Sequence, residues 1–491
     1  MPTTLEHHRR SLSRHTDAAK KAQLGQFFTP ESTARFMAGL FPDANGECRL
    51  LDAGAGIGSL SAAFLARWRA GELHFQNVSV NSFEIDPVLL PYLQETLASF
   101  ANDERYSQSI ANTDFIRASV EARDQSLFSE PGITYTHAIL NPPYKKITND
   151  SPHRAMLRRF GIETVNLYSA FVALAIAQMV PGGQLVAILP RSFCNGPYYR
   201  PFREFILART AIRRLHLFAS RTTAFKDDAV LQENLILHLE CGARQDAVTV
   251  STSTDDSFSD LSINVHAFET IVPPGDAECT IHIPTTLEDQ SPSLSPDFCN
   301  NLADIGLSVS TGPVVDFRLR EHLRDIPSAE TVPLLYPGHF PQKILTWPVA
   351  GGKKPNAICR NPITEKWLYP TGFYCVVRRL SSKEERQRIV AAVVDPEVFG
   401  NVPMLGFENH LNVFHDSRMG LPKELAYGLA AFLNTPTVDA AFRRFNGHTQ
   451  VNATDLRLLR YPSREILCEM GRKCLCSESE RMPSVMEPIP A

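Results

Sequence analysis

Residues 140–144 read Leu-Asn-Pro-Pro-Tyr and directly follow an apolar stretch, residues 135–140, that is typical of a buried strand. The amide of Asn141 and the rigid backbone carbonyls beside it can accept hydrogen bonds from an exocyclic amine, and the ring of Tyr144 can stack on the heterocycle that carries the amine. Open α/β sheets bind ligands at the carboxyl ends of their strands. The alternative is a strand that simply ends in a proline turn. We predict a site for an amino group on a planar ring, with the catalytic residues Asn141, Pro142, Pro143 and Tyr144.

A glycine-rich turn lies about ninety residues earlier, where an apolar strand runs into residues 52–58, Asp-Ala-Gly-Ala-Gly-Ile-Gly, and then into a helix start. Glycines at such a turn let the backbone approach a ligand closely. The spacing differs from the dinucleotide pattern Gly-x-Gly-x-x-Gly, and an acid at the strand end repels a pyrophosphate but attracts the ammonium of a methionine moiety. The turn therefore favours S-adenosylmethionine as the cofactor, bound by Asp52, Gly54, Gly56 and Gly58.

Two acidic residues farther along complete a predicted cofactor site. Residues 78–83 form a second apolar strand, and Glu84 at its end is placed to bind ribose hydroxyls. Asp86 precedes a proline and is predicted to cap a helix that begins at Pro87. Asp114 offers an acceptor for the adenine amine of the cofactor, although a plain turn residue is an equally good interpretation.

The order of these motifs resembles the N6-adenine DNA methyltransferases of the γ arrangement. In that family, a segment like residues 25–31, Gly-Gln-Phe-Phe-Thr-Pro-Glu, precedes the glycine loop and closes over the cofactor. By itself the segment is a helix start, with a helix predicted over residues 32–40. The resemblance makes Phe28 and Thr29 cofactor-binding residues.

The resemblance extends to the PstI and BsuBI type of modification methyltransferase and spans roughly residues 20 to 465. It rests also on residues 141–146, 161–163, 165–168, 171–174, 306–312 and 445–456. It implies an α/β fold, with a doubly wound, mostly parallel, seven-stranded methyltransferase sheet and a C-terminal α+β target-recognition domain. It further implies a monomeric, site-specific DNA adenine N6-methyltransferase of a type II restriction-modification system. Such an enzyme acts on double-stranded DNA and pairs functionally with a separate restriction endonuclease without required physical contact.

An adenine inside duplex DNA reaches such a pocket only when it is flipped out of the stack. Tyr144 is predicted to supply one face for the flipped base, and Phe225 matches the family's second aromatic. The alternative role for Phe225 is to anchor its loop to the core. The amine is a poor nucleophile because its lone pair is delocalised, so hydrogen bonds to Asn141 and to the carbonyl of Pro142 are expected to expose that lone pair. A cysteine nucleophile for cytosine ring methylation would need a Pro-Cys dipeptide, which the chain lacks.

Composition suggests how the chain is divided. Its net charge is only −4, but residues 246–299 hold ten acidic residues and no lysine or arginine. We interpret this stretch as a connection that faces away from phosphates. The predicted parts are a methyltransferase domain at 1–245, an acidic connecting segment at 246–299, a DNA target-recognition domain at 300–465 and a polar tail at 466–491.

Several basic and polar residues are candidates for DNA contact. Arg191, Arg200 and Arg221 are predicted to lie in loops, where phosphate contact is reasonable. In the C-terminal domain, residues 378–379, 443–444 and the polar run 446–452 offer donors and acceptors that suit base edges. Turn formation is the commoner role of such polar runs.

The remaining features limit the class of protein. The ten cysteines show no metal spacing and indicate free thiols, so we expect no metal site. No secretory signal begins the chain, and the longest apolar stretch, residues 167–180, is too short to cross a membrane and predicts a buried helix. We therefore expect a cytoplasmic protein without membrane contact.

Two other functions fit parts of the pattern. Methyltransferases that act on a protein glutamine amide or an RNA adenine present the same planar nitrogen to Asn-Pro-Pro-Tyr, and a catalytically silent DNA-binding module would keep the fold. The segment at residues 25–31 and the large C-terminal region argue against the first, and an intact Asn141 and Asp52 argue against the second.

Overall fold

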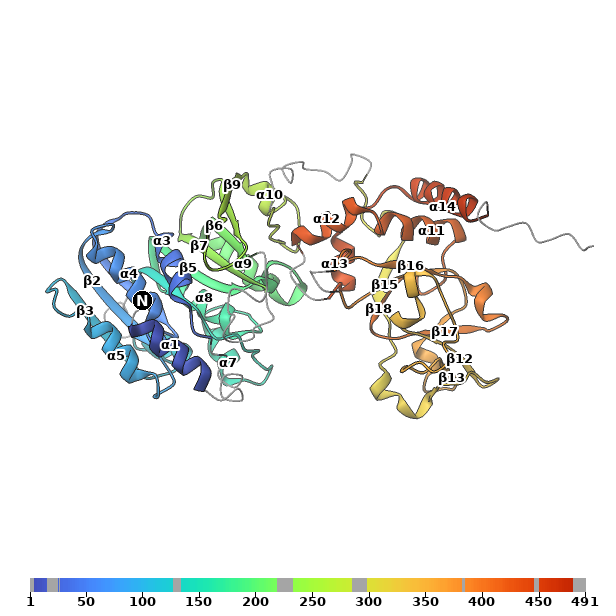
Figure 1. The fold of residues 1–491 in the computed structure, drawn as a ribbon, viewed down its shortest axis with the longest axis horizontal. Helices are drawn as coiled ribbons and strands as arrows, with labels where there is room; N and C mark the ends of the chain where they lie inside the picture. Colours follow the sequence, from blue (N-terminus) through green and yellow to red (C-terminus); the bar gives the residue numbers. More distant parts are fainter. Residues whose placement is uncertain are drawn as a thin grey trace, which may run out of the picture. The chain divides into compact units, whose positions relative to one another are not determined.

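The computed structural model describes residues 4–15, 25, 27–126, 134–218, 233–284, 298–381, 385–445 and 450–479. The chain divides into two compact units, Met1–Ser291 and Pro292–Ala491. Figure 1 shows both, coloured along the sequence, and each is described here by itself.

The first unit is built on a nine-stranded sheet with the order β3-β2-β1-β4-β5-β7-β6-β8-β9. Strands β1 to β5 pair in parallel, and β7 runs antiparallel to both β5 and β6. The predicted seven strands are present, and two more extend the sheet. Their bounds are β1 Asn45–Ala53, β2 His74–Phe83, β3 Tyr106–Ala111, β4 Tyr135–Leu140, β5 Met179–Pro190, β6 Thr210–Phe218, β7 Asn234–Cys241, β8 Val248–Ser253 and β9 Ser262–His266.

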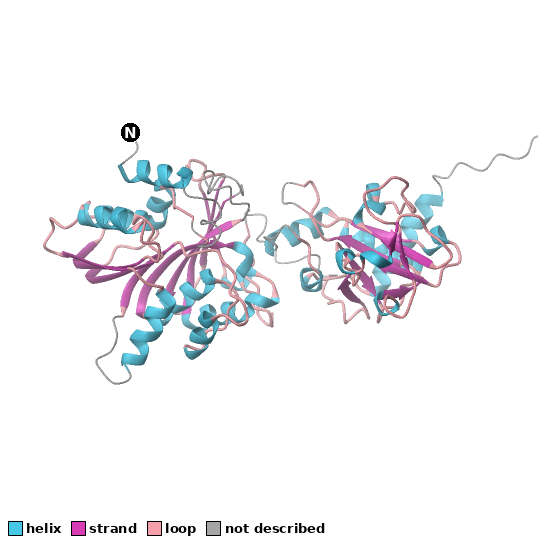
Figure 2. Ribbon diagram, turned by 90° about the horizontal axis from the view of Figure 1, so that it is seen from below, coloured by secondary structure: helices cyan, strands magenta, loops and turns pink. Residues whose placement is uncertain are grey.

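Helices cover both faces of this sheet (Figure 2) because its central strands are apolar on both faces. Along β1, Leu50 packs into one core and Leu51 into the other, as the period of two in a strand requires. One core contains α3 Glu31–Gly39, α4 Ser59–Arg69 and α5 Leu90–Ala98. The other contains α6 Phe115–Ser126, α7 Pro152–Arg159, α8 Leu167–Ala177 and α9 Arg200–Arg209.

Helix α8 confirms the prediction of a buried helix, since all residues from Tyr168 to Ile176 are buried. Among the helices of the described ranges, none is both long and apolar enough to cross a membrane. The unit also contains α1 Thr4–His15, α10 Phe268–Ile271 and the 3-10 helices η1 Arg191–Cys194 and η2 Pro197–Tyr199.

The acidic segment predicted to connect two domains is instead largely part of the first unit. Strand β8 pairs in parallel with β6, and β9 pairs antiparallel with β8. Val248 and Val250 are buried on one side of β8, whereas three of the acidic residues, Asp255, Asp256 and Asp260, lie in the turn that follows it. The number of acidic residues gave no sign of this strand, and the boundary between the units lies after Ser291 rather than at residues 245 and 299.

The second unit combines two sheets with helices, which confirms the predicted α+β fold. The four-stranded sheet has the order β10-β18-β15-β16, and the five-stranded sheet has the order β11-β13-β12-β17-β14. The strands are β10 Ser308–Thr311, β11 Leu323–Arg324, β12 Thr331–Leu335, β13 Ala357–Cys359, β14 Leu368–Pro370, β15 Tyr374–Arg378, β16 Ala391–Val394, β17 Met404–Phe407 and β18 Leu411–His415. The helices are α11 Lys423–Leu433, α12 Pro436–Phe445, α13 Ala453–Leu458 and α14 Arg464–Ser479, with 3-10 turns η5 Asp316–Arg318, η6 Arg320–His322, η7 Pro337–His339, η8 Pro341–Lys343, η9 Glu365–Trp367 and η10 Pro396–Phe399.

The polar tail predicted at residues 466–491 is wrong for its first part, because residues 464–479 form α14. This helix packs against α11 with its backbone at very short range, and Leu467 on it is fully buried. A Cβ atom at Gly428 would lie 1.7 Å from the carbonyl oxygen of Leu467, and one at Gly471 would lie 1.8 Å from the carbonyl oxygen of Glu424. The two glycines are what lets the helices approach this closely.

Gly428→Ala is therefore expected to destabilise the second unit by about 3 kcal/mol, because a methyl group at this crossing forces the helices apart. Thermal unfolding of the full chain, followed by circular dichroism, measures the effect. Gly338→Ala is the matched control, since a Cβ there meets nothing within 4 Å. Equal melting temperatures for the two variants would contradict the described packing.

Candidate active site

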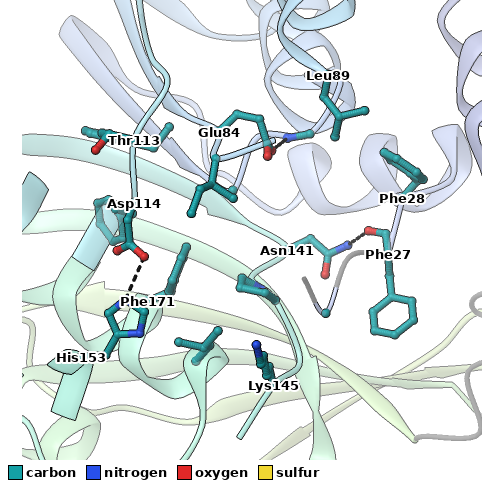
Figure 3. Close-up of a pocket in the computed structure, with 18 residues that line it drawn as sticks. Phe27, Phe28, Glu84, Leu89, Thr113, Asp114, Asn141, Lys145, His153 and Phe171 are labelled. Carbon is teal, nitrogen blue, oxygen red and sulfur yellow. Dashed lines mark hydrogen bonds and ion pairs between the residues drawn. The ribbon is translucent and has the colours of Figure 1, made fainter. Parts of the chain in front are cut away.

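The loops that follow β1, β2 and β4 meet at the carboxyl edge of the sheet, where they enclose a cavity of about 190 Å³ (Figure 3). Seven of the predicted site residues line it: Phe28, Gly54, Gly56, Glu84, Asp114, Asn141 and Pro143. The other lining residues are Gly25, Phe27, Phe83, Ile85, Leu89, Thr113, Phe115, Lys145, His153, Leu167 and Phe171. Phe225 lies outside the described residues.

The glycine loop adopts a backbone that only glycine takes without strain. Gly54, Gly56 and Gly58 have φ values of 79°, 57° and 84°. The amides of Gly54 and Ala55 donate to the carbonyl oxygen of Phe83 at the end of β2, at 2.8 and 3.0 Å. Gly58 caps α4, and a Cβ there would come within 3.0 Å of the Leu93 side chain. The loop is thus fixed to the neighbouring strand and helix, and its first glycines form one wall of the cavity.

Glu84 joins the glycine loop to the second strand. Its Oε2 accepts from the amide of Gly56 at 2.8 Å and its Oε1 from the amide of Asp86 at 2.7 Å. Burial raises the pKa of Glu84, and these two backbone hydrogen bonds partly offset that effect. Each carboxylate oxygen keeps a free lone pair, so the oriented group can still accept from hydroxyls in the cavity.

Asp86 forms a local turn rather than the start of a helix. Its Oδ1 accepts from the amide of Val88, and α5 begins only at Leu90. The prediction of a helix that begins at Pro87 was therefore wrong by three residues, because the turn at Asp86 comes before the first helical hydrogen bond.

Asp52 lies fully buried behind the glycine loop. The hydroxyl of Ser61 on α4 donates to its Oδ2 at 2.6 Å, whereas its Oδ1 has no partner among the described residues. Loss of solvation raises the pKa of Asp52 to about 7. In this position the carboxyl ties β1 to α4, and the predicted contact with a cofactor ammonium stays a prediction.

The stability of the protein should therefore depend on pH through Asp52. The folded group keeps its proton up to about pH 7, whereas the unfolded group loses it near 3.8. Between these values the folded state binds one more proton, so the free energy of unfolding falls by about 1.4 kcal/mol per pH unit. We expect Asp52→Asn, which cannot ionise, to match the wild type near pH 4 and to melt at increasingly higher temperature than the wild type up to pH 7. Melting curves recorded across this range test the prediction, and a constant difference between the two proteins would refute it.

Asn141 is held in one orientation by the segment that precedes α3. Its Nδ2 donates to the carbonyl oxygen of Phe27 and to Oγ1 of Thr29, both at 2.9 Å (Figure 3 shows Asn141 facing this segment). Because the carbonyl oxygen of Phe27 can only accept, the amide nitrogen must face it and Oδ1 must point the other way. That Oδ1 is buried and has no hydrogen-bond partner within the part of the chain that the structure describes.

Thr29 and Phe28, both predicted to bind the cofactor, have different positions. Thr29 is buried and braces Asn141, so it orients a pocket residue from behind. Phe28 lines the cavity and packs with Ile57 and Leu89.

Tyr144 is held firmly beside Asn141. Its hydroxyl donates to the carbonyl oxygen of Ile188 at 3.2 Å, and its ring centroid lies 5.3 Å from that of Phe27 and 6.2 Å from that of Tyr168. Burial raises the pKa of the Tyr144 hydroxyl far above its ordinary value. Pro142 is buried and Pro143 is partly buried, so the whole run is rigid. The predicted stacking of Tyr144 on a base stays a prediction.

Asp114 caps a helix and also lines the cavity, whereas its predicted contact with the adenine amine of the cofactor stays a prediction. Its Oδ1 accepts from the amide of Arg117 in the first turn of α6, and its Oδ2 lies 2.9 Å from Nε2 of His153. Burial raises the pKa of Asp114, but the hydrogen bonds from His153 and Arg117 outweigh this effect and lower it overall. The residue is thus a helix cap whose other oxygen faces the cavity.

Sequence reasoning missed His153, Phe171 and Lys145 as cavity residues. Phe171 lies in a run that carried the family resemblance, and Lys145 directly follows the Asn-Pro-Pro-Tyr run. The sequence context of each could therefore have indicated a position in the cavity. Nothing in the local sequence indicated a position in the cavity for His153, because its neighbours in sequence show no motif.

Most of the arginines predicted to contact DNA are committed to contacts within the protein. Arg191 is buried in η1 and pairs with Glu233 at 3.0 Å, which corrects its placement in a loop. Arg200 is the first residue of α9 rather than a loop residue, pairs with Glu204 on the same helix at 2.8 Å and stays half-exposed. Arg221 lies outside the described residues.

The C-terminal candidates follow the same pattern. Arg378 pairs with Glu385, and Arg443 pairs with Asp439 on α12 at 2.7 Å. Arg379 donates to the carbonyl oxygen of Asn409. At the end of the polar run, Asn452 forms a capping box with Asp455 at the start of α13. Residues 446–449 lie outside the described residues.

All ten cysteines are free thiols in the structure. Within the described ranges, no group of three or more His, Cys, Asp or Glu side chains is arranged to hold a metal ion.

Comparison with known proteins gives consistent matches along the chain. The family model described as Eco57I restriction-modification methylase matches residues 74–225. The type II methyltransferase M.BsuBI of Bacillus subtilis is 53% identical over 92% of this chain and 90% of its own length. The type II methyltransferase M.PstI of Providencia stuartii is 42% identical over 95% of this chain and 92% of its own length.

Among solved structures, the cryoEM structure of the DrdV–DNA complex matches with a TM-score of 0.54 and 13% sequence identity, and the match covers 95% of this chain and 59% of that one. This match supports the fold alone. The identities to M.BsuBI and M.PstI extend over nearly the whole length of both relatives and include both units of this chain. The chain belongs to the type II DNA methyltransferases, the modification enzymes of restriction-modification systems.

Proposed function

We propose that this methyltransferase binds S-adenosylmethionine in the cavity at the edge of the first unit's sheet and methylates N6 of an adenine flipped out of double-stranded DNA at a specific sequence. The observation that carries the proposal is the buried Oδ1 of Asn141, which is oriented by Phe27 and Thr29 and lacks a partner within the described part of the chain. A buried acceptor without a donor is costly, and an exocyclic amine would satisfy it.

The cavity residues fit the proposed cofactor. Glu84 has acceptor capacity for ribose hydroxyls, and Asp114 has an oxygen that faces the cavity. Phe28, Leu89 and Phe171 also line the cavity and provide apolar walls for a flat ring. Gly56 lines the cavity beside Phe28, and a Cβ at this position would make ordinary van der Waals contact with the Phe28 ring at 3.9 Å. When bound, S-adenosylmethionine supplies a methyl group that is already activated by a positively charged sulfur.

The protein's own contribution to the reaction is positioning. Oδ1 of Asn141 would accept a hydrogen bond from the target amine, which draws the nitrogen away from planarity and exposes its lone pair to the methyl group. The rigid prolines and the fixed Tyr144 ring keep this acceptor in place and exclude water from the reacting nitrogen. We infer that Tyr144 and Phe225 hold the flipped base between them.

The substrate class sets the remaining expectations. The second unit is the proposed target-recognition domain, and a separate restriction endonuclease that cuts the same sequence is the proposed functional partner. We place the activity in the cytoplasm of the host, because the DNA to be protected lies there, and we propose that the enzyme acts as a monomer.

The substrate class is tested by incubation of the full-length protein with S-adenosylmethionine labelled in its methyl group and, separately, with duplex DNA, RNA of the same sequence and an unrelated protein mixture. We expect label in duplex DNA only, with saturation at a small number of sites that share one short sequence. Label in RNA or protein would contradict the proposal, and so would label spread over all sequences.

A further inference from the structure

His153 reaches the cavity from a helix that no sequence motif connects with it. It is the second residue of α7, it lines the cavity, and its Nε2 lies 2.9 Å from Oδ2 of Asp114 (Figure 3 shows the pair joined). Thirty-nine residues separate the two side chains in the sequence, so only the fold brings them together.

Helix α7 is attached firmly to α6, which Asp114 caps. Arg123 of α6 donates to the carbonyl oxygen of Arg159 at 3.1 Å, and its guanidinium lies 4.4 Å from the ring centroid of Phe160. Leu157 of α7 is fully buried in the core that lies beneath both helices. His153 is therefore carried on a fixed support rather than on a loose loop.

The placement of His153 is unusual for a helix. The amino end of a helix carries partial positive charge and favours acids, so a histidine that can protonate is poorly suited to it. Asp114 needs only one oxygen to cap α6, and the amide of Arg117 already uses Oδ1. The contact of Oδ2 with His153 is thus additional to what the helix requires, and both side chains face the cavity.

We propose that His153 is a positioning residue that fixes the Asp114 carboxylate as an acceptor for the adenine amine of S-adenosylmethionine and closes the adenine end of the cavity. With Nε2 of His153 on Oδ2, the carboxylate cannot rotate away, and its remaining lone pairs face inward. The carboxylate can then accept a hydrogen bond from an amine at position 6 of the purine. A carbonyl oxygen at that position would instead be repelled by the negatively charged carboxylate. This inference rests on the proposed function, because it assumes that the cavity binds S-adenosylmethionine.

The test compares binding of S-adenosylhomocysteine and of its inosine analogue, which has a carbonyl in place of the amine, by calorimetry on the full-length protein. We expect His153→Ala to weaken S-adenosylhomocysteine binding by on the order of tenfold, the effect of one hydrogen bond to a charged group, and to narrow the preference over the inosine analogue. His153→Gln keeps a hydrogen-bond donor. It should therefore restore much of the affinity for S-adenosylhomocysteine and much of the preference for it over the inosine analogue. In methylation assays, KM for the cofactor should rise while kcat at saturation changes little.

His74→Ala is the matched control, since Nδ1 of His74 lies 2.8 Å from Oδ1 of Asp43 in an exposed pair away from the cavity, and it should leave all these values unchanged. An unchanged preference in His153→Ala, or a fall in kcat without a change in KM, would overturn this inference alone. If the wild type bound neither compound, the proposed function would fail together with it.

Discussion

Asn141→Ala is expected to reduce methyl transfer by on the order of a thousandfold, comparable with the loss of a key polar group in other active sites. The variant removes the buried Oδ1 that would accept from the target amine, so the lone pair stays delocalised. Affinity for S-adenosylhomocysteine should stay within a few-fold of the wild type, because Glu84 and the glycine loop are untouched. Single-turnover methylation and calorimetry measure the two quantities.

Thr29→Val provides a graded comparison for this prediction. It removes one of the two acceptors of the Asn141 amide and keeps the carbonyl oxygen of Phe27. The amide is then held less firmly but in the same orientation, so we expect a loss of about tenfold in rate. Full activity of Asn141→Ala, or a larger loss in Thr29→Val than in Asn141→Ala, would be incompatible with Asn141 as the acceptor.

Glu84→Ala is expected to lower the affinity for S-adenosylmethionine by on the order of a hundredfold. The carboxylate holds the amide of Gly56 and would accept the ribose hydroxyls, so its loss both loosens the glycine loop and removes ligand contacts. Titration calorimetry with S-adenosylhomocysteine measures the effect. At saturating cofactor, the rate of methyl transfer should fall by no more than about tenfold, since Asn141 keeps its hydrogen bonds to Phe27 and Thr29.

Glu84→Gln should fall between the wild type and the alanine variant, because one oxygen acceptor remains. Glu72→Ala is the control, since Glu72 pairs with Arg67 on the surface. Should Glu84→Ala bind S-adenosylhomocysteine as tightly as Glu72→Ala does, the assignment of Glu84 would be wrong.

The sequence predicted best the features that depend on local pattern. Strand β4 occupies residues 135–140 as predicted, because an apolar run that ends at Asn-Pro-Pro can continue no further. The glycine turn was predicted for the same kind of reason, as its three glycines take a left-handed backbone. These features placed Asn141, Gly54, Gly56 and Glu84 correctly at the cavity.

Features that depend on partners distant in sequence were not predictable. The partners of Arg191 and Arg443 come from other segments, so basic residues expected at DNA turned out to form ion pairs within the protein. Helix α14 lacks a strong pattern of its own, and its place in the fold depends on the glycine contact with α11 and on the burial of Leu467 in the core of the second unit. His153 reaches Asp114 through the packing of α7 on α6, which no local pattern encodes.

The central claim, that a buried amide oxygen selects an exocyclic adenine amine, is tested most directly by identification of the methylated nucleoside. Duplex DNA is methylated by the full-length enzyme with labelled S-adenosylmethionine, digested to nucleosides and separated by chromatography. We predict that all label co-migrates with N6-methyldeoxyadenosine. Label in N4-methylcytosine or 5-methylcytosine would contradict the account.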